Sequence, residues 1–321
     1  MKELSWTLAS MGQLSVLMEA SSPKPGNVNR LRRFSDTGYR HFVASACLVG
    51  RGLYAGAQVG VRLAKGQMGF ERVRIGRVIL KCADDVFTGL SRRNTILGTI
   101  LLQAPLVVAL AATVQSDGSF TLKTAKTWIE PILRNTSVED TIDVYRAFHL
   151  ARPGGSMNKE GPAWTEKQDR YDIDNPEVYH NIRKDRITLY DLFRASADVD
   201  VISREWAEHF RLTLNEVFPH LDSLSHGLED IEEAIVETFL WLLSRRPDGL
   251  IAKKAGTEKA EQVRTMAKRV LDEKGGESRP GELLRQFDKM LRKDGNRLNP
   301  GTTADLVSAA TFCKLVSIIY P

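Results

Sequence analysis

Polar turns that contain glycine interrupt the apolar segments of this sequence, and the first holds a lysine between two prolines. It spans residues 22–30 and reads SPKPGNVNR. Proline stiffens the backbone on both sides of Lys24. The ammonium of Lys24, the amides of Asn27 and Asn29 and the guanidinium of Arg30 together suit a phosphate or a sugar hydroxyl. A solvated turn between two helices is the alternative, and the sequence matches no standard phosphate-loop motif.

The second polar turn, Arg92-Arg93-Asn94-Thr95, leads directly into an apolar segment that begins at Ile96. Asn94 or Thr95 is a natural N-cap for a helix that starts there. The free N–H groups of such a helix start, together with two arginines, also predict an anion-binding site. Both interpretations remain open at this point.

The third polar turn, NRLNPGTTAD at residues 296–305, opens the last apolar segment. Thr302 and Asp305 stand three positions apart, as in a capping box, so Asp305 has a purely structural explanation. The alternative is a catalytic or metal-binding carboxylate. Lys253 and Lys254 are further cations that could meet an anionic ligand.

Helical periodicity dominates the segments that must position these turns, and no strand-like alternation exceeds about five residues, the best case being 70–75. We therefore predict an all-α fold, a single multi-helix bundle, with a domain boundary in the irregular stretch 151–185 as the competing possibility. The expected helices cover approximately residues 4–18, 39–63, 78–88, 95–114, 122–133, 139–150, a segment near 187, 204–217, 231–243, 256–273, 281–292 and 302–319.

Composition excludes several protein classes. The 321 residues are 42% hydrophobic and 26% charged, which is typical of globular proteins and not of disordered chains. The net charge of +5 favours anionic partners without requiring nucleic acid. Three widely spaced cysteines predict buried thiols in a reducing compartment, and the six histidines lack metal-ligand spacing. The first ten residues resemble a helix start rather than a signal peptide, so we expect a cytoplasmic protein.

The apolar run from Ile96 to Val114 is nearly long enough to cross a membrane. Gln103 and Pro105 interrupt it, and we identify no second span. We therefore expect a buried helix at the centre of the bundle, because a helix that is apolar all round packs inside a large protein.

Five motifs together resemble the triphosphoribosyl-dephospho-coenzyme A synthase family. Residues 19–30 resemble its E-x-x-x-x-PKPG-x-V-(D/H)-R signature, and residues 34–45 its H-x-D-M-x-x-x-x-F-x-x-S segment. Residues 94–98 resemble G-x-N-T-x-x-G. The remaining matches are to D-x-x-x-V-Y followed by Gly-Gly, and to the terminal N-P-G-x-x-A-D-L. They fall on Asp140, Val144, Tyr145, Gly154, Gly155, Asn299, Pro300, Gly301, Ala304, Asp305 and Leu306.

The resemblance implies an all-helical enzyme that transfers the 5-triphosphoribosyl group of ATP to the 2′-hydroxyl of dephospho-CoA, with Mg²⁺, and releases adenine. Phe34 replaces the family histidine, Thr37 the methionine, and Asn29 the residue before Arg30. These departures keep two alternatives open: a different acceptor, such as a pterin precursor, or a nucleotide-binding homologue without turnover. The sequence leaves the oligomeric state open, a dimer being possible, and it indicates neither a nucleic-acid nor a membrane partner.

Breaking the N-glycosidic bond of ATP builds positive charge on the ribose, which a carboxylate stabilises. We expect Asp36 and Asp305 to be catalytic and to lie across one cleft, and we expect Asp36, Asp140 and Asp305 to bind Mg²⁺. The expected ATP and phosphate ligands are Lys24, Asn27, Arg30, Arg92, Arg93, Asn94, Thr95 and Lys253. The expected substrate-binding residues are Asn29, Gly154, Gly155, Asn299 and Gly301.

Overall fold

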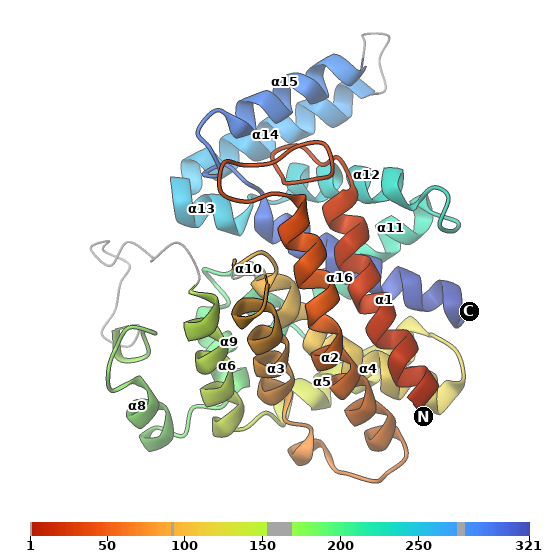
Figure 1. Cartoon of the computed structure of the whole chain (residues 1–321), viewed down its shortest axis with the longest axis vertical. Helices are drawn as coiled ribbons and strands as arrows, with labels where there is room; N and C mark the ends of the chain where they lie inside the picture. The colour runs from red at the N-terminus through yellow and green to blue at the C-terminus, as the bar shows by residue number, and fades with distance from the viewer. Residues whose placement is uncertain (1, 91–92, 153–168, 275–279) are drawn as a thin grey trace.

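The computed structural model describes residues 2–90, 93–152, 169–274 and 280–321, and these residues are helical almost throughout (Figure 1). They contain no β-strand, only an isolated bridge between Asn29 and Arg32. The predicted all-α fold is confirmed. The helices are α1 (Lys2–Ser21), α2 (Tyr39–Ala64), η1 (Phe70–Arg72), α3 (Ile75–Thr88), α4 (Leu97–Asp117), α5 (Leu122–Arg134), α6 (Val138–Ala151), α8 (Val178–Lys184), α9 (Leu189–Ser196), α10 (Val201–Ala207), η2 (Thr213–Val217), α11 (Phe218–Leu224), α12 (Ile231–Arg245), α13 (Gly249–Ala255), α14 (Thr257–Lys274), α15 (Pro280–Arg292) and α16 (Gly301–Ile319).

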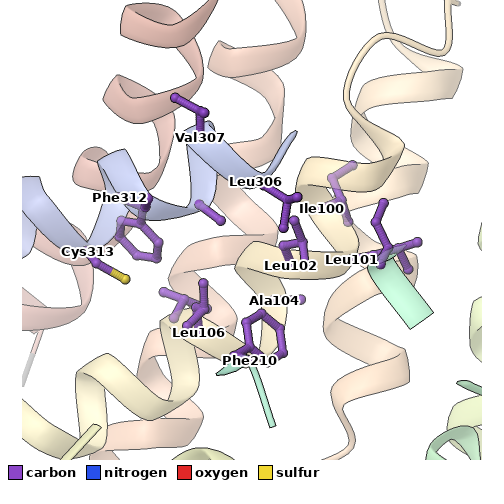
Figure 2. Packing of buried hydrophobic residues seen from close by; sticks show 14 of the residues in the cluster. Ile100, Leu101, Leu102, Ala104, Leu106, Phe210, Leu306, Val307, Phe312 and Cys313 are labelled. Carbon is purple, nitrogen blue, oxygen red and sulfur yellow. The ribbon is translucent and has the colours of Figure 1, made fainter. Parts of the chain in front are cut away.

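The predicted central helix is α4, and it lies inside the bundle. Figure 2 shows Leu102 and Leu106 of this helix facing Leu306 and Phe312 of α16, with Phe210 beside them. All five side chains are buried. Because α4 is surrounded by other helices, it needs no polar face, which explains its largely apolar sequence.

Among the described residues, two helices are long and apolar enough to cross a membrane, α4 and α16. The second was not expected from the sequence. Their most apolar windows are 94% and 72% buried within the fold, respectively. Both therefore serve as core helices of the described structure, since their apolar side chains are already covered by neighbouring helices.

Helices α1 and α2 run side by side in opposite directions, and the polar turn at residues 22–38 connects them at one end (Figure 1). The hairpin of α14 and α15 extends over this same end. Both α1 and α2 also pack on α4, and α1 packs on α16. The first and third polar turns thus belong to neighbouring helix ends.

Residues 70–75, the best case of strand-like alternation, include the short helix η1 and the start of α3, in agreement with the predicted absence of sheet. Two other local expectations are wrong. The stretch 151–185 includes helix α8, because Val178 and Ile182 are buried against Ile142 of α6. Cys47 is exposed, whereas the other two cysteines are buried as expected.

The helix expected at 204–217 is divided by a turn. His209 and Phe210 adopt left-handed backbone angles, with φ of 54° and 62°. The buried carboxylate of Glu205 stabilises the turn by accepting hydrogen bonds from the backbone N–H groups of Leu212 and Thr213, both at 2.8 Å. Burial raises the pKa of Glu205 to about 7. Local periodicity does not reveal such a turn, because it depends on a buried side chain seven residues away.

Candidate active site

Asp305 is the fifth residue of α16, and its side chain contacts the start of α4. Its Oδ1 accepts a hydrogen bond of 2.6 Å from the Thr99 hydroxyl. A Cβ atom on Gly98 would lie 2.1 Å from Asp305 Oδ2, so only glycine leaves room for the carboxylate. The side chain thus reaches across to another helix rather than back to its own first turn. The capping-box explanation of Asp305 is wrong.

The first turn of α16 is instead satisfied by Asp248, which precedes α13. Asp248 is 2% exposed, and its Oδ2 accepts hydrogen bonds from the backbone N and the hydroxyl of Thr303, at 2.7 and 2.8 Å. Its Oδ1 caps α13 through the N–H groups of Leu250 and Ile251. Because Asp248 accepts the hydrogen bonds of the first turn of α16, Asp305 is not needed as a helix cap.

The surroundings of Asp305 favour its protonated form. Burial raises its pKa to about 8, and the nearby carboxylates of Glu19 and Asp248 act in the same direction. The hydrogen bond from Thr99 opposes this shift but does not cancel it. Asp305 is therefore a carboxylic acid that can hold a proton near neutral pH, which is the property of a general acid.

Lys24 is fully buried and forms an ion pair with Glu19 of α1. Its Nζ lies 3.0 Å from Glu19 Oε1, and it also donates to the backbone oxygens of Glu19 and Ser22. Burial lowers the pKa of Lys24 and raises that of Glu19. All three ammonium donors are therefore used inside the protein. A contact between Lys24 and a phosphate stays a prediction, and it requires this pair to open.

The turn that contains Lys24 packs against α15 and forms hydrogen bonds with it. The backbone N of Gly26, whose φ is 75°, donates to Asp288 Oδ1 at 2.8 Å. Arg292 donates to Asp288 and to the backbone oxygen of Asn27. A Cβ on Gly26 would lie 2.6 Å from Leu291 and 3.1 Å from Pro300. The left-handed glycine thus brings the first and third polar turns into contact.

Asn27, Asn29 and Asn299 lie along this junction. Asn29 is 3% exposed and shapes its own turn, since its Oδ1 accepts from the N–H of Leu31 at 2.9 Å. Asn27 Nδ2 and Asn299 Oδ1 are buried without a hydrogen-bond partner in the described structure. Gly301 begins α16 beside them. These two unsatisfied amide groups keep Asn27 and Asn299 as candidate ligands for a substrate.

Asp36 lies in a tight turn that precedes α2, where the backbone N of Phe34 donates to the oxygen of Thr37 at 2.9 Å. It is exposed and helps to line a cavity of about 260 Å³ formed by residues 29–41. Phe34, which replaces the family histidine, is buried with the Arg292 guanidinium 5.2 Å from its ring centre. At the position of the family histidine, this chain therefore has an aromatic ring that stacks on Arg292.

Asp305 is not among the residues that line this cavity. Charged side chains link the two carboxylates: Lys254 interacts electrostatically with both Asp36 and Asp248, and Asp248 in turn with Asp305. A cleft shared by Asp36 and Asp305 stays a prediction.

The second polar turn does not cap α4, as one of the two interpretations of the sequence required. The helix α4 begins at Leu97, so neither Asn94 nor Thr95 caps it. The hydroxyl of Thr95 instead lies 2.8 Å from that of Ser45 on α2. Arg93 and Asn94 are exposed, and Arg92, with Gly154 and Gly155, lies outside the described residues.

Besides Lys24, two more of the predicted phosphate ligands are engaged in ion pairs. Arg30 forms a bidentate pair with Glu232, with Nη2 at 2.8 Å from Oε1. The Nζ of Lys253 lies 2.6 Å from Asp200 Oδ1. Each cation must therefore exchange a carboxylate for a phosphate if it binds ATP, so their role stays a prediction.

The predicted three-carboxylate Mg²⁺ site is not assembled. Asp140 is buried on α6, where it accepts hydrogen bonds from the backbone N–H groups of Gly76 and Ser137 and joins α6 to α3. No group of three or more His, Cys, Asp or Glu side chains in the described ranges is arranged to hold a metal ion. Asp140 is satisfied structurally, and the other two carboxylates lie on other elements.

Sequence reasoning did not assign roles to several side chains that the structure brings to this end of the bundle. Glu19 belonged to a recognised motif, and its spacing from Lys24 was the available signal. The basic run NRLRRF was visible, but only its first arginine was selected. Thr99 gave no local signal, because its partner Asp305 is 206 positions away, and the contact of Asp248 with Thr303 spans 55 positions. The residues concerned are Glu19, Arg32, Arg33, Arg40, Thr99 and Asp248.

Gly98→Ala tests whether the close approach of Asp305 matters. We expect turnover to fall by about a hundredfold, because displacement of a catalytic group by about 1 Å can cost that much. Steady-state rates and thermal unfolding should be measured together, with Gly227→Ala as control, since a Cβ at Gly227 meets nothing within 4 Å. Normal turnover of Gly98→Ala would show that the position of Asp305 is unimportant.

The chain was compared with protein-family models and with solved structures. The model of a family described as CitG, ATP:dephospho-CoA triphosphoribosyl transferase, matches residues 5–319. A crystal structure of an Archaeoglobus fulgidus protein, described as a candidate triphosphoribosyl-dephospho-CoA synthase, is similar in fold. Its TM-score is 0.55 at 24% identity, and the alignment covers 83% of this chain and 98% of that one. Since the family model spans nearly the whole chain, and the family's motifs from the first and last polar turns meet at one end of the bundle, this protein belongs to the CitG family of ATP:dephospho-CoA triphosphoribosyl transferases.

Proposed function

We propose that this protein transfers the 5-triphosphoribosyl group of ATP to the 2′-hydroxyl of 3′-dephospho-CoA. In this reaction the C1′–N9 bond of ATP breaks, a bond forms between C1′ and the acceptor oxygen, and adenine leaves. The adenine gains one proton and the hydroxyl loses one, so none is consumed overall. Family membership supports the reaction class, and the environment of Asp305 supports the chemistry.

Asp305 is the proposed general acid. Adenine is a poor leaving group as an anion, so protonation as the bond breaks lowers the barrier. A carboxyl group with a pKa of about 8 is protonated at neutral pH and can donate. This property, in a side chain that Gly98 and Thr99 hold in place, is the single observation that carries the assignment.

Asp36 is the proposed second carboxylate, either as acceptor of the hydroxyl proton or as Mg²⁺ ligand. It is exposed, in a pocket otherwise rich in arginine. One protein carboxylate together with substrate phosphates is a common way to hold Mg²⁺, so the residues present fit an ion that arrives with ATP. The ion would neutralise part of the triphosphate charge.

The test is adenine release from ATP and Mg²⁺, followed by chromatography, with the acceptor varied. Adenine together with a product of the mass of triphosphoribosyl-dephospho-CoA would support the proposal. Adenine formed only with a different acceptor, such as a pterin, would retain ribosyl transfer and replace the acceptor. No adenine with any acceptor would favour a nucleotide-binding homologue without turnover.

A further inference from the structure

The pocket formed by residues 29–41 is built from ordered turns rather than from a loose surface loop. Backbone hydrogen bonds join Asn29 and Arg32 in both directions, at 2.9 and 3.2 Å. A second turn closes between Phe34 and Thr37, and α2 follows at once. These turns enclose the cavity of about 260 Å³. That volume is below the roughly 300 Å³ at which pockets hold a whole drug-sized ligand, so it suits one part of a substrate.

Three arginines of this pocket have no carboxylate partner. Arg32, Arg33 and Arg40 are exposed, and no ion pair involves them within the described ranges. Their neighbour Arg30, by contrast, is neutralised by Glu232. All three line the same pocket and give it a positive charge that suits an anionic ligand.

The positive end of α2 adds to this group. Its N-cap is Gly38, and the aliphatic part of Arg33 packs beside it, with 3.6 Å between the Arg33 Cβ and a Cβ placed on Gly38. Arg40 stands in the first turn of the same helix. Phosphate oxygens bind well where guanidinium groups and a helix start converge.

Asp36 is the only carboxylate among the residues that line the pocket. By itself it would repel an anion. A divalent cation between Asp36 and the phosphates turns this repulsion into attraction, as in many nucleotide sites.

We propose that this pocket binds the triphosphate of the donor nucleotide through Arg32, Arg33 and Arg40, with Asp36 as the protein ligand of the accompanying Mg²⁺. A triphosphate carries about four negative charges, which three arginines and the start of α2 match better than they match the smaller charge of a diphosphate acceptor. The inference rests on the proposed function for the identity of the nucleotide. It assigns the phosphate contacts to arginines at positions that the family motifs leave unspecified.

Calorimetric titration with inorganic tripolyphosphate, with ATP and with dephospho-CoA tests the proposal on the full chain. Arg33→Ala/Arg40→Ala should weaken tripolyphosphate and ATP by about tenfold or more for each arginine. Arg62→Ala is the matched control, because Arg62 is exposed at the opposite end of the same helix and has no ion pair in the described structure. Circular dichroism checks that each variant is folded.

Asp36→Asn gives a test of opposite sign. Without Mg²⁺ the variant should bind tripolyphosphate more tightly than the unmodified protein, because a repelling charge is gone. With Mg²⁺ it should lose most of the enhancement that the ion gives the unmodified protein. A Mg²⁺ enhancement equal to that of the unmodified protein would overturn the role of Asp36.

The outcomes separate this proposal from the proposed function. Absent binding of tripolyphosphate, or affinity unchanged in the double arginine variant, overturns the phosphate site. A loss confined to dephospho-CoA reassigns the pocket to the acceptor and also overturns it. If tripolyphosphate binding depends on the arginines but no acceptor supports adenine release, the phosphate site stands and the proposed function fails.

Discussion

Asp305→Asn should lower the rate of adenine release by about a hundredfold or more while leaving the fold intact. The amide has nearly the shape of the carboxyl group and can still accept the hydrogen bond from Thr99, but it cannot donate a proton to adenine. The measurement compares steady-state adenine release with the circular dichroism spectrum of the same preparation. A variant that is folded and retains most of the turnover would exclude Asp305 as the general acid.

The pH dependence of the unmodified enzyme distinguishes an acid from a base at this position. If Asp305 must donate a proton, the rate falls as the pH rises through about 8, the pKa of its carboxyl group. If Asp305 acts as a carboxylate instead, the rate rises through the same range. A pH–rate profile from pH 6 to about 9.5 shows which limb is present.

The same carboxyl group links folding stability to pH. The folded protein retains a proton that the unfolded chain loses above about pH 4, because the pKa rises from 3.8 to about 8 on folding. The contribution of Asp305 is therefore most favourable below about pH 4, declines up to about pH 8, and stays at its minimum above that. Asp305→Asn removes this decline, so the variant should gain stability relative to the unmodified protein as the pH rises.

Asp248→Asn is the matched control for the adenine-release rate and the folding stability of Asp305→Asn. Asp248 is a carboxylate buried beside the first turn of α16, and its oxygens accept four hydrogen bonds. An amide nitrogen cannot accept, so this variant should lose stability, by roughly 1–3 kcal/mol for the buried groups left unpaired. Opposite effects of the two substitutions on stability would show that Asp305 is retained for function and Asp248 for structure.

Lys24→Ala should destabilise the fold by about 3–5 kcal/mol, because it leaves the Glu19 carboxylate buried without its partner. Against a typical total of about 5–15 kcal/mol, this is a large fraction of the stability. The measurement is chemical unfolding of the unmodified and variant proteins at the same pH. An unchanged midpoint and slope would show that Lys24 is not held in the buried pair.

The double variant Glu19→Gln/Lys24→Met provides the control. It removes both charges at similar volume, and such replacements are often tolerated far better than the loss of one partner. A double-mutant cycle with the two single variants then gives the coupling between Glu19 and Lys24. ATP affinity, measured where the variants are folded, separately tests the predicted phosphate contact of Lys24.

Most of the secondary structure could be predicted from the sequence because its determinants are local. Apolar residues at three- and four-residue spacing mark α1 and α2, and proline with glycine ends α1 at the first polar turn. The long, largely apolar run from Ile96 to Val114 identified α4 as the central helix. The same reasoning failed at 204–217, where a buried Glu205 stabilises a left-handed turn against the helical pattern.

The sequence also located the polar turns, since glycine, proline and asparagine between apolar helices are recognisable without a structure. It could not decide what each side chain in them does. Asp305 and Thr302 matched a capping box, yet the partner of Asp305 is Thr99, 206 positions away. Lys24 appeared to be a free cation between prolines and is fully buried with Glu19.

Asp140 is a residue to which the sequence assigned a functional role and for which the structure shows structural contacts. As an acidic residue of a recognised motif it was grouped with Asp36 and Asp305, but it lies on α6 and accepts the N–H of Gly76. Helices and turns follow from spacing along the chain, because the forces that form them act over about four residues. Burial, ion pairing and the pKa of Asp305 follow from which helices pack together, and this only the tertiary structure decides, because the atoms involved meet across long stretches of the chain.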